Sequence, residues 1–482
     1  MATRVLILSA SVGAGHNAAA AAIAQELATY PDLEVRNEDA LRMTTRLYQV
    51  TAADAYFALV RESPWYVGWL YDYNDEPFRN ERGMLLLWNM LNGQPIAALI
   101  EEYNPDIIVC THFMPAGIVA QLLIEERIRA RLAIVTTDYD FQGMWLSRTF
   151  NRYFVALDES AAFLASLGVD PTRITVSGIP VSARLNQPVD TASVRARYNL
   201  DPDLPTLLVS AGALGGGPAL EIVEQIMRMQ TAVQVIVVCG HNRALRQEVS
   251  ARTAQQAERF RILGFTREMP ELMRVATLFL GKPGGLTTAE CMVAGLPMVV
   301  IEPIPGQEER NSDHLLENGA AIRCRNLPAL AFKLDRILSD PQRLAGLRMG
   351  TSRLARPDAA RLIAETLLND RTEPFVFAAD QRRRIIAAAR GNSVPGAVEP
   401  TPLNTTALYN DETGVYIGVI SAGQMAFLVD QLEEEGFDDD HYYIDEATLA
   451  YLQQAGADNE LLALLGEALR DHGPTEIRFI RP

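Results

Sequence analysis

A glycine-rich turn near the start of the sequence carries groups suited to anion binding or to proton transfer. An apolar run at 5–8 leads into SASVGAGHNAAAAAI, residues 9–23, so we expect a strand, a glycine turn and an alanine-rich helix in succession. Backbone N–H groups at the start of such a helix attract negatively charged groups. The turn also carries His16, and a neutral imidazole can accept a proton near pH 7.

The same turn fits the pattern of dinucleotide-binding proteins. Gly13, Gly15 and Ala18 match G-x-G-x-x-A, and Glu38 and Asp39 follow at about the spacing at which an acidic residue binds the ribose of NAD. Three interpretations stay open from this turn alone: a dinucleotide site, a site for another anion or a sugar, and a turn that serves packing.

Two later glycine clusters repeat the arrangement. SAGALGGG at 210–217 and GKPGGLTTAE at 281–290 each join an expected strand to an expected helix. Glycine at four of the eight positions in the first cluster is more than a packing turn needs, and it favours a phosphate. The second cluster lacks G-x-x-x-x-G-K-[ST] and is not a P-loop. Its Glu290 either stabilises the helix start or accepts hydrogen bonds from two ribose hydroxyls.

A fourth polar stretch, EPIPGQEERN at 302–311, follows the apolar run 298–301. If that run is a strand, the stretch lies at its carboxyl end, where ligands bind in α/β sheets. The alternative is a solvated loop.

The elements that must position these groups alternate along the chain. Apolar runs separated by helix-like stretches predict an α/β protein with two doubly wound Rossmann-like domains, 1–180 and 200–370, facing each other across a cleft. The first set of expected strands is 5–8, 33–37, 107–110, 133–136, 153–156 and 174–177; the second is 206–210, 233–239, 262–264, 278–280, 298–301 and 321–324. A long helical segment, 327–368, is expected to close the second domain.

The end of the chain has a different composition. Residues 371–402 are rich in proline and charge and predict a linker, and 403–482 predict a small acidic α/β module. Residues 401–482 hold 16 acidic and 3 basic side chains, so most of the net charge of −17 belongs to the module. The remaining chain is close to neutral, which favours no nucleic-acid partner but leaves membrane contact open. The sequence indicates no partner for the module.

Cysteine usage and hydropathy point to a cytosolic protein. Cys110, Cys239, Cys291 and Cys324 are widely spaced, mostly in apolar runs, which predicts reduced, buried thiols and no zinc site. No apolar run approaches the roughly 18 residues of a membrane-spanning helix. The opening residues MATRVLILSA predict a first strand and not a signal peptide.

Aromatic residues in the first domain are candidates for membrane contact. Trp65, Trp69 and Trp88 lie among leucines and tyrosines with arginines nearby, a composition that suits insertion at a headgroup interface. The alternative is that these residues form buried helix faces.

Taken in order, the motifs resemble a known family. LSASVGAGHNAAAAAI, THFMP, VTTDYDF, RYFVALDES, VSGIPVSARL, SAGALGGGP and GFTREMPELMRVATLFLGKPGGLTTAECMVAGLPMVVIEPIPGQEERN span about residues 1–370. They resemble the GT-B glycosyltransferases of the monogalactosyldiacylglycerol synthase and processive diacylglycerol glucosyltransferase group, which are similar to the peptidoglycan enzyme MurG.

The resemblance implies that the second domain binds a UDP-sugar. Glu290 would accept hydrogen bonds from the ribose, Phe265 would lie beside the uracil, and Gln307 and Glu308 would bind hydroxyls of the donor sugar. The full set implied for the UDP-sugar is Gly212, Gly215, Gly216, Phe265, Gly284, Gly285, Thr287, Glu290, Gln307, Glu308 and Asn311.

The resemblance also implies that the first domain binds the acceptor. His16 would take the proton of the acceptor hydroxyl, with Gly13, Gly15, His112 and Asp138 on the same side. The alternatives for His16 are that it positions the substrate or is structural. A direct displacement of this kind inverts the anomeric configuration. Helix N-termini and backbone amides stabilise the leaving diphosphate, so no metal or other cofactor is required. We expect His241, in CGHN, to be structural.

Asp138-Tyr139-Asp140 is the one motif that suggests a metal. It matches the D-x-D with which metal-dependent glycosyltransferases bind a divalent cation, but it falls in the expected acceptor domain, so we predict no metal there. The chain departs from the family pattern just after it, because Gln142 stands where a histidine usually precedes the aromatic residue.

The sequence therefore predicts a hexosyltransferase. It would move a hexose from a UDP-sugar to diacylglycerol or a glycosyldiacylglycerol, with inversion, while peripherally bound to the cytoplasmic membrane face. Three alternatives stay open: transfer of N-acetylglucosamine to a lipid-linked precursor, as MurG does, an NAD-dependent oxidoreductase, and a sugar-nucleotide sensor without catalysis.

Overall fold

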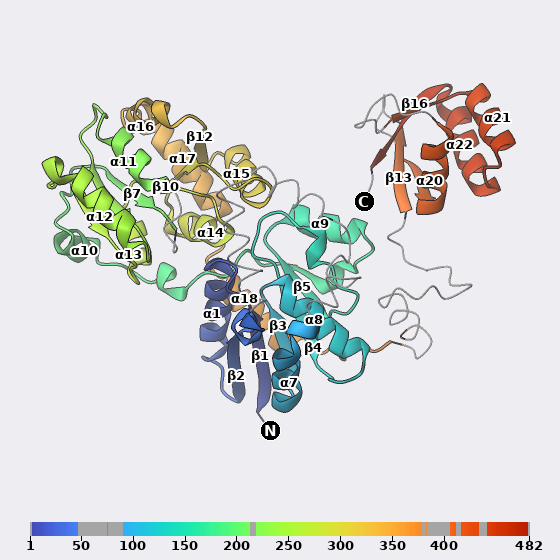
Figure 1. Cartoon of the computed structure of the whole chain (residues 1–482), viewed down its shortest axis with the longest axis horizontal. Helices are drawn as coiled ribbons and strands as arrows, with labels where there is room; N and C mark the ends of the chain where they lie inside the picture. The colour runs from blue at the N-terminus through green and yellow to red at the C-terminus, as the bar shows by residue number, and fades with distance from the viewer. Residues whose placement is uncertain are drawn as a thin grey trace. The chain divides into compact units, whose positions relative to one another are not determined.

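The computed structural model describes residues 2–46, 75, 90–212, 218–377, 382, 405–410, 416–432 and 441–480. The chain divides into two compact units (Figure 1). The first, Met1–Leu164 and Asp170–Val394, contains nearly all of both α/β domains, and the second, Ala165–Val169 and Pro395–Pro482, contains the C-terminal module. Trp65, Trp69, Trp88, Gly215 and Gly216 lie outside the described residues, so their predicted contacts stay predictions.

The first domain is a parallel six-stranded sheet with the order β2-β1-β3-β4-β5-β6. Its strands are β1 (Thr3–Ser9), β2 (Leu33–Asp39), β3 (Ile107–Cys110), β4 (Arg131–Val135), β5 (Arg152–Val155) and β6 (Ile174–Val176). The main helices are α1 (Gly15–Leu27), α7 (Gln94–Tyr103), α8 (Phe113–Ile124) and α9 (Asp158–Ser166). The order of the strands reverses between β1 and β3, so a ligand crevice is expected at the carboxyl ends of these two strands.

The second domain is also a parallel six-stranded sheet, with the order β12-β11-β10-β7-β8-β9. Its strands are β7 (Thr206–Ser210), β8 (Gln234–Val238), β9 (Phe260–Leu263), β10 (Leu278–Gly281), β11 (Met298–Ile301) and β12 (Ala321–Cys324). The helices that border its crevice are α11 (Ala219–Ile226), α12 (Arg243–Arg252), α13 (Met269–Val275), α14 (Gly285–Ala294) and α15 (Gln307–Glu317). Here the order reverses between β7 and β10.

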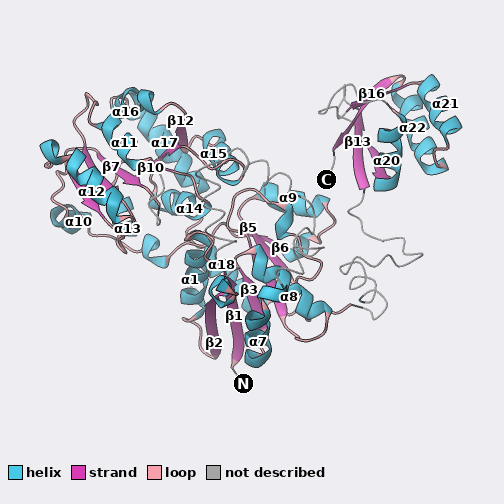
Figure 2. Cartoon of the chain, in the orientation of Figure 1, coloured by secondary structure: helices cyan, strands magenta, loops and turns pink. Residues whose placement is uncertain are grey.

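Every strand predicted for the two sheets is present within a few residues of its expected bounds (Figure 2). The fold prediction is confirmed: both sheets are parallel and helices cover them. The four cysteines are free and buried, as predicted. Among the described residues, no helix combines the length and the hydropathy that crossing a membrane requires.

The helical segment expected at 327–368 is interrupted. It forms α16 (Leu330–Leu338), α17 (Pro341–Leu354) and α18 (Ala359–Asn369). Asp340 ends the first piece and caps the next, because its carboxylate accepts hydrogen bonds from the N–H groups of Gln342 and Arg343 at 3.0 Å each.

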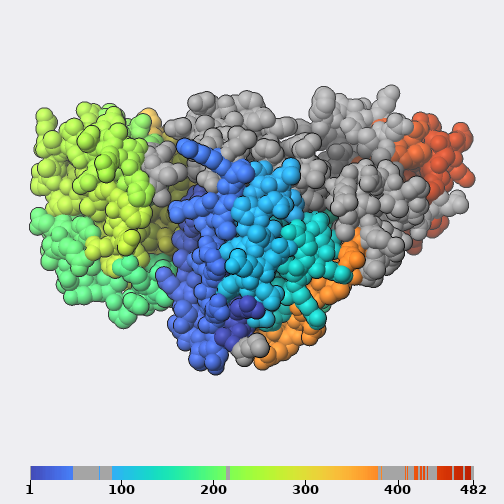
Figure 3. All heavy atoms as spheres, turned by 60° about the horizontal axis from the view of Figure 1, so that its bottom comes forward, coloured from blue at the N-terminus to red at the C-terminus, as the bar shows by residue number. Residues whose placement is uncertain are grey.

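Helix α18 packs in the first domain, although the sequence places residues up to 370 in the second. Ile363, Ala364 and Leu367 are buried in one apolar cluster with Val5 and Ile23 of the first sheet and α1. The orange surface in Figure 3 lies against the blue and cyan surface of the first domain. The predicted boundary at 370 therefore differs from the packing, because the apolar face of α18 matches the first sheet.

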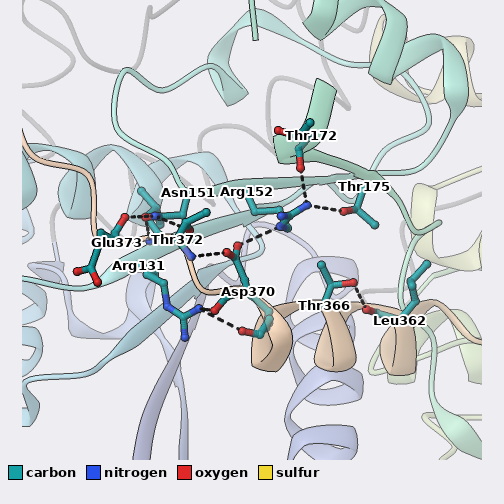
Figure 4. A network of polar contacts seen from close by, with 12 residues as sticks. Arg131, Asn151, Arg152, Thr172, Thr175, Leu362, Thr366, Asp370, Thr372 and Glu373 are labelled. Carbon is teal, nitrogen blue, oxygen red and sulfur yellow. Dashed lines mark hydrogen bonds and ion pairs between the residues drawn. The ribbon is translucent and has the colours of Figure 1, made fainter. Parts of the chain in front are cut away.

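Polar contacts tie the end of α18 to the amino ends of β4 and β5 (Figure 4). The Arg152 guanidinium and the Asp370 carboxylate are 3.1 Å apart, and their side chains are 16% and 5% exposed. Arg131 donates to the backbone carbonyls of Leu367 and Asp370. The Asn151 amide donates to the carbonyl of Glu373 at 2.8 Å. The segment that follows α18 is thus held at the amino ends of the strands, which is the end of the sheet opposite the crevice.

The C-terminal module is a four-stranded antiparallel sheet with the order β14-β13-β16-β15. Its elements are β13 (Thr405–Asn410), β14 (Tyr416–Ser421), α20 (Ala422–Gln431), β15 (His441–Ile444), α21 (Glu446–Ala455), α22 (Asn459–His472) and β16 (Thr475–Ile480). A single apolar cluster, which includes Leu408, Ile420, Leu452 and Leu465, forms its core. Strand β13 was not predicted, because TTALYN carries little apolar alternation and its central place depends on pairing with β14 and β16.

Replacing Asp370 with alanine should lower the free energy of unfolding of the first unit by about 3 kcal/mol, because Arg152 is left without its carboxylate in a largely buried place. Hydrogen exchange of the α18 amides and urea unfolding would measure the loss.

Burial raises the pKa of Asp370, but hydrogen bonds from Thr372 and Arg152 hold that pKa below its ordinary value. The contribution should therefore be present at neutral pH and be lost as the pH falls below the ordinary aspartate pKa.

Glu373→Ala is the matched control, because Glu373 pairs with Arg129 where both side chains are exposed, at 84% and 76%. That substitution should change stability by less than about 1 kcal/mol. Equal losses for the two variants would contradict the role given to Asp370.

Candidate functional site

His16 lies in the first turn of α1, at the crevice of the first sheet. Its Nδ1 is 3.0 Å from the Thr111 carbonyl oxygen and 2.8 Å from Thr137 Oγ1. The Thr111 hydroxyl donates to the His16 carbonyl at 3.1 Å, so the start of α1 and the residue after β3 are joined here in both directions. A carbonyl oxygen only accepts, so Nδ1 of His16 carries the proton. The lone pair is therefore on Nε2, which forms no hydrogen bond with any described residue.

Burial keeps this imidazole uncharged. It lowers the pKa of His16 to about 4, although the Thr111 carbonyl acts in the opposite direction. The ring is neutral at pH 7, and its free Nε2 can accept a proton from a substrate hydroxyl.

His112 lies next to His16 and has a structural task. Its Nδ1 accepts a hydrogen bond at 3.0 Å from the N–H of Met114, which caps the start of α8. The two histidine rings meet edge to face, with 4.6 Å between centroids. Burial, with a smaller effect of His16, lowers the pKa of His112. His112 is thus beside the candidate base, and its Nδ1 is already used; its place on the acceptor side stays a prediction.

The acidic residues that would serve a dinucleotide are engaged elsewhere. Asp39 accepts hydrogen bonds from the N–H of Ser11 at 3.1 Å and from the Asn17 amide at 3.2 Å, so its carboxylate holds the glycine turn in shape. Glu38 pairs with Arg36 at 2.7 Å. The turn needs glycine at Gly13, where φ is +92°. These contacts account for the G-x-G-x-x-A pattern without a dinucleotide.

The start of α14 meets the first domain at Gly285. A Cβ atom there would lie 2.0 Å from the Thr137 carbonyl oxygen and 3.0 Å from an oxygen of Asp138, so glycine alone fits. A Cβ at Gly15 would lie 3.6 Å from Leu286, so the starts of α1 and α14 are also neighbours. The crevices of the two sheets therefore open toward the same place.

The predicted donor residues gather in the first turns of α14. Gly284, Gly285, Thr287 and Glu290 belong to its N-cap and the turns that follow. Burial raises the pKa of Glu290 to about 7. The hydroxyl of Thr288 is fully buried and has no hydrogen-bond partner among the described residues. The start of this helix thus presents N–H groups that have no partner within the helix, together with the carboxyl group of Glu290.

The start of α15 crosses to the first domain through side chains. Gln307 donates to the Asp138 carboxylate at 2.6 Å. The fully buried Asn311 donates to the Pro283 carbonyl at 3.1 Å and accepts from the N–H of Tyr139 at 3.0 Å. Asp138, predicted on the acceptor side, thus contacts residues predicted for the donor. Glu308 accepts from the N–H of Ile304 at 2.7 Å, and burial raises its pKa.

The two carboxylates of the D-x-D motif point to different partners. Asp138 contacts Gln307 and Asn311, and burial raises its pKa to about 6 while these hydrogen bonds lower it. Asp140 forms an ion pair with Arg310. No group of three or more potential ligands that could hold a metal ion occurs in the described part of the chain. The expectation that no metal is needed stays a prediction.

Phe265 lies in a groove at the carboxyl ends of β8 and β9. Its side chain is 54% exposed, and its ring stacks on His241 with 4.4 Å between centroids and 13° between planes. The groove has a volume of about 400 Å³ and is also lined by Tyr198, Arg243 and Arg246. From the sequence we expected His241 to be structural and did not predict its contact with Phe265. The available signal was that CGHN and GFT follow two strands that could be neighbours. Gly212 follows β7 with φ +78°, so the glycine there is required by the backbone.

Comparison with protein families matches each α/β domain separately. Residues 16–181 match the monogalactosyldiacylglycerol (MGDG) synthase family, and residues 206–356 match the glycosyltransferase family 28 C-terminal domain.

The chain is also similar to individual bacterial proteins. A processive diacylglycerol β-glucosyltransferase of Bacillus subtilis (strain 168) is 26% identical over 389 residues, which cover 80% of this chain and 99% of that protein. One of Bacillus mycoides (strain KBAB4) is 30% identical over 274 residues, covering 57% and 70%. The crystal structure of Acinetobacter baumannii MurG has the same fold, with a TM-score of 0.52 and 18% identity over 76% of this chain and 100% of that one.

The orientation of His16 can be tested by ¹⁵N NMR of the histidine side chains. The ring should carry its proton on Nδ1 at pH 7 and become charged only near pH 4, because the surrounding protein desolvates this partly buried ring. Thr137→Ala should keep the same tautomer, since the Thr111 carbonyl remains. A neutral ring protonated on Nε2, or a ring that is half charged at pH 6.5, would contradict the assignment.

In the unfolded chain the His16 imidazole becomes charged near pH 6.5. His16 should therefore lower the free energy of unfolding as the pH falls from 6.5 toward 4.

Proposed function

This chain belongs to the glycosyltransferase family of the processive diacylglycerol β-glucosyltransferases, and from that premise we propose that it transfers a hexose from a UDP-sugar to diacylglycerol or a glycosyldiacylglycerol. The proposed reaction inverts the anomeric configuration. The acceptor is a membrane lipid, so the enzyme would work at a membrane surface, peripherally on the cytoplasmic face, with Trp65, Trp69 and Trp88 as candidate contacts.

The observation that carries this proposal is the orientation of His16 opposite the start of α14. The Thr111 carbonyl fixes the proton on Nδ1, so Nε2 can take the proton of the acceptor hydroxyl. The freed oxygen would attack the anomeric carbon as the bond to the diphosphate breaks, and UDP would leave with that electron pair. The N–H groups at the start of α14 and the turn at Gly212 would stabilise the charge that develops on the diphosphate.

The remaining donor groups fit the same arrangement. Glu290 would accept hydrogen bonds from the ribose hydroxyls, and the groove at Phe265 and His241 would hold the uracil. Gln307 and Glu308 would bind hydroxyls of the hexose, close to Asp138 of the other domain. The NAD alternative has no comparable support, because Asp39 is engaged in holding the first turn.

The direct test is incubation of the full chain with vesicles that contain either diacylglycerol or a lipid-linked peptidoglycan precursor and, in turn, UDP-glucose, UDP-galactose, UDP-N-acetylglucosamine and NAD. Products would be identified by mass spectrometry and their anomeric configuration by NMR. The proposal expects a β-hexosyl lipid from UDP-glucose or UDP-galactose. Transfer to a lipid-linked peptidoglycan precursor alone, or binding of UDP-sugars with no transfer to any lipid, would overturn it.

His16→Ala should lower kcat by about 10²–10⁴-fold, the usual contribution of a general base, and leave UDP affinity within about twofold. Turnover on vesicles and calorimetric titration with UDP would separate the two effects. His241→Ala is the matched control, because that ring stacks on Phe265 and should raise the donor KM with a much smaller effect on kcat. Near-normal turnover of the His16 variant would exclude His16 as the base.

Glu290→Gln should weaken UDP binding by about tenfold or more, because a charged acceptor of two hydrogen bonds is replaced by an amide. The pKa of Glu290 in the free protein is raised to about 7, and the ligand prefers the charged form. Wild-type affinity should therefore fall as the pH decreases below 7. The variant should lose this dependence, and a wild-type affinity independent of pH between 5 and 8 would contradict the role of Glu290.

A further inference from the structure

A second groove lies beside the donor residues, between α9 of the first domain and α15 of the second. It has a volume of about 530 Å³, within the size range of small-ligand sites. The residues of interest along it are Tyr139, Asp140, Glu159, Phe163, Arg310 and His314. Both domains therefore contribute to its walls.

The lining combines ring faces with hydroxyl-binding groups. Phe163 is 39% exposed and presents its ring to the groove. Tyr139 stacks on His314 across the domain boundary, with 4.9 Å between centroids and 20° between planes. Carboxylates accept hydrogen bonds from hydroxyl groups, and an apolar ring covers the C–H face of a sugar. This is the chemistry of a site for a polyhydroxyl compound.

Charge excludes a phosphorylated ligand from this groove. Glu159, Asp313 and Glu317 line it, and none of them forms an ion pair within the described ranges. The guanidinium of Arg310 is already paired with Asp140 and with Asp75. A phosphate or pyrophosphate headgroup would meet several negative charges, and the guanidinium among the described lining residues is already paired, whereas a neutral sugar would not be repelled.

The groove is joined to the donor residues by two parallel contacts. Asp138 and Asp140 are two residues apart, and their partners Gln307 and Arg310 are one helical turn apart on α15. The first contact is at the proposed donor sugar and the second is in the groove. A ligand in the groove would thus lie next to the sugar being transferred.

We propose that this groove binds the sugar headgroup of a neutral, already glycosylated acceptor lipid, and so determines whether a second sugar is added. The inference rests on the proposed function and adds a subsite to it. The first transfer, to diacylglycerol, leaves the groove empty; the second requires it.

Binding can be tested without turnover. With the proposed diphosphate site saturated by UDP, saturation-transfer NMR with octyl β-D-glucoside below its micelle concentration should show contact with the wild-type chain, and octyl phosphate should show none. Phe163→Ala should weaken glucoside binding at least fivefold. The matched control is Phe332→Ala, at a phenylalanine that is 63% exposed on α16, away from the groove. Equal binding of octyl phosphate, or equal effects of the two variants, would overturn the proposal.

Turnover then tests the consequence. With diacylglycerol as the sole acceptor, Phe163→Ala and Glu159→Gln should keep kcat/KM within about twofold of the wild type. With glucosyldiacylglycerol as the sole acceptor, kcat/KM should fall at least tenfold, and monoglycosyl lipid should accumulate. Glu248→Gln, on α12, is the control for Glu159→Gln. A similar fall with both acceptors, or no fall with either, would overturn the subsite.

The binding and turnover experiments distinguish a failure of this inference from a failure of the proposed function. If the wild-type chain transfers sugar to neither acceptor, the proposed function fails, and glucoside binding that depends on Phe163 still supports a sugar site. If transfer occurs but the glucoside binds equally to the Phe163 and Phe332 variants, the subsite fails and the proposed function stands.

Discussion

The close approach of Gly285 to the Thr137 carbonyl is the constraint on which the rest of the cleft depends. With 2.0 Å between that oxygen and the place of a Cβ atom, any other residue would push the two domains apart. The contact brings the crevice of one sheet to the crevice of the other. It also sets the distance at which Gln307 reaches Asp138 and Asn311 reaches Tyr139 and Pro283. Gly285, which we propose contacts the nucleotide, thus also permits the contact between the domains.

The path of the chain reinforces this arrangement. After leaving the second sheet, it returns to the first through α18 and is held there by Arg131, Asn151 and Arg152 at the edge opposite the cleft. The two domains are therefore linked by chain crossings in addition to the side-chain contacts. The acidic module follows the returning segment and has an apolar core of its own.

Much of this could be predicted from sequence, because the signals are local. Buried parallel strands are continuous apolar runs, and glycine turns at their ends mark the crevices, so the two sheets and the places of His16 and Glu290 follow from pattern. Contacts across the domains are not encoded locally. The return of α18 depends on which sheet its apolar face matches, and the pairing of Asp138 with Gln307 joins positions 169 residues apart. The stacking of His241 on Phe265 arises only because β8 and β9 are neighbours.

Holding His16 by a backbone carbonyl, and not by a carboxylate, has a consequence for repeated turnover. A buried carboxylate would stabilise the charged ring and retain the proton between cycles. Next to a neutral carbonyl, with a pKa of about 4, His16 in its proposed role as the base would give its proton to water at neutral pH once the product has left. The neutral base would then be regenerated without a second acid–base group. Its weak basicity would make protonation unfavourable in free energy only during the transfer itself.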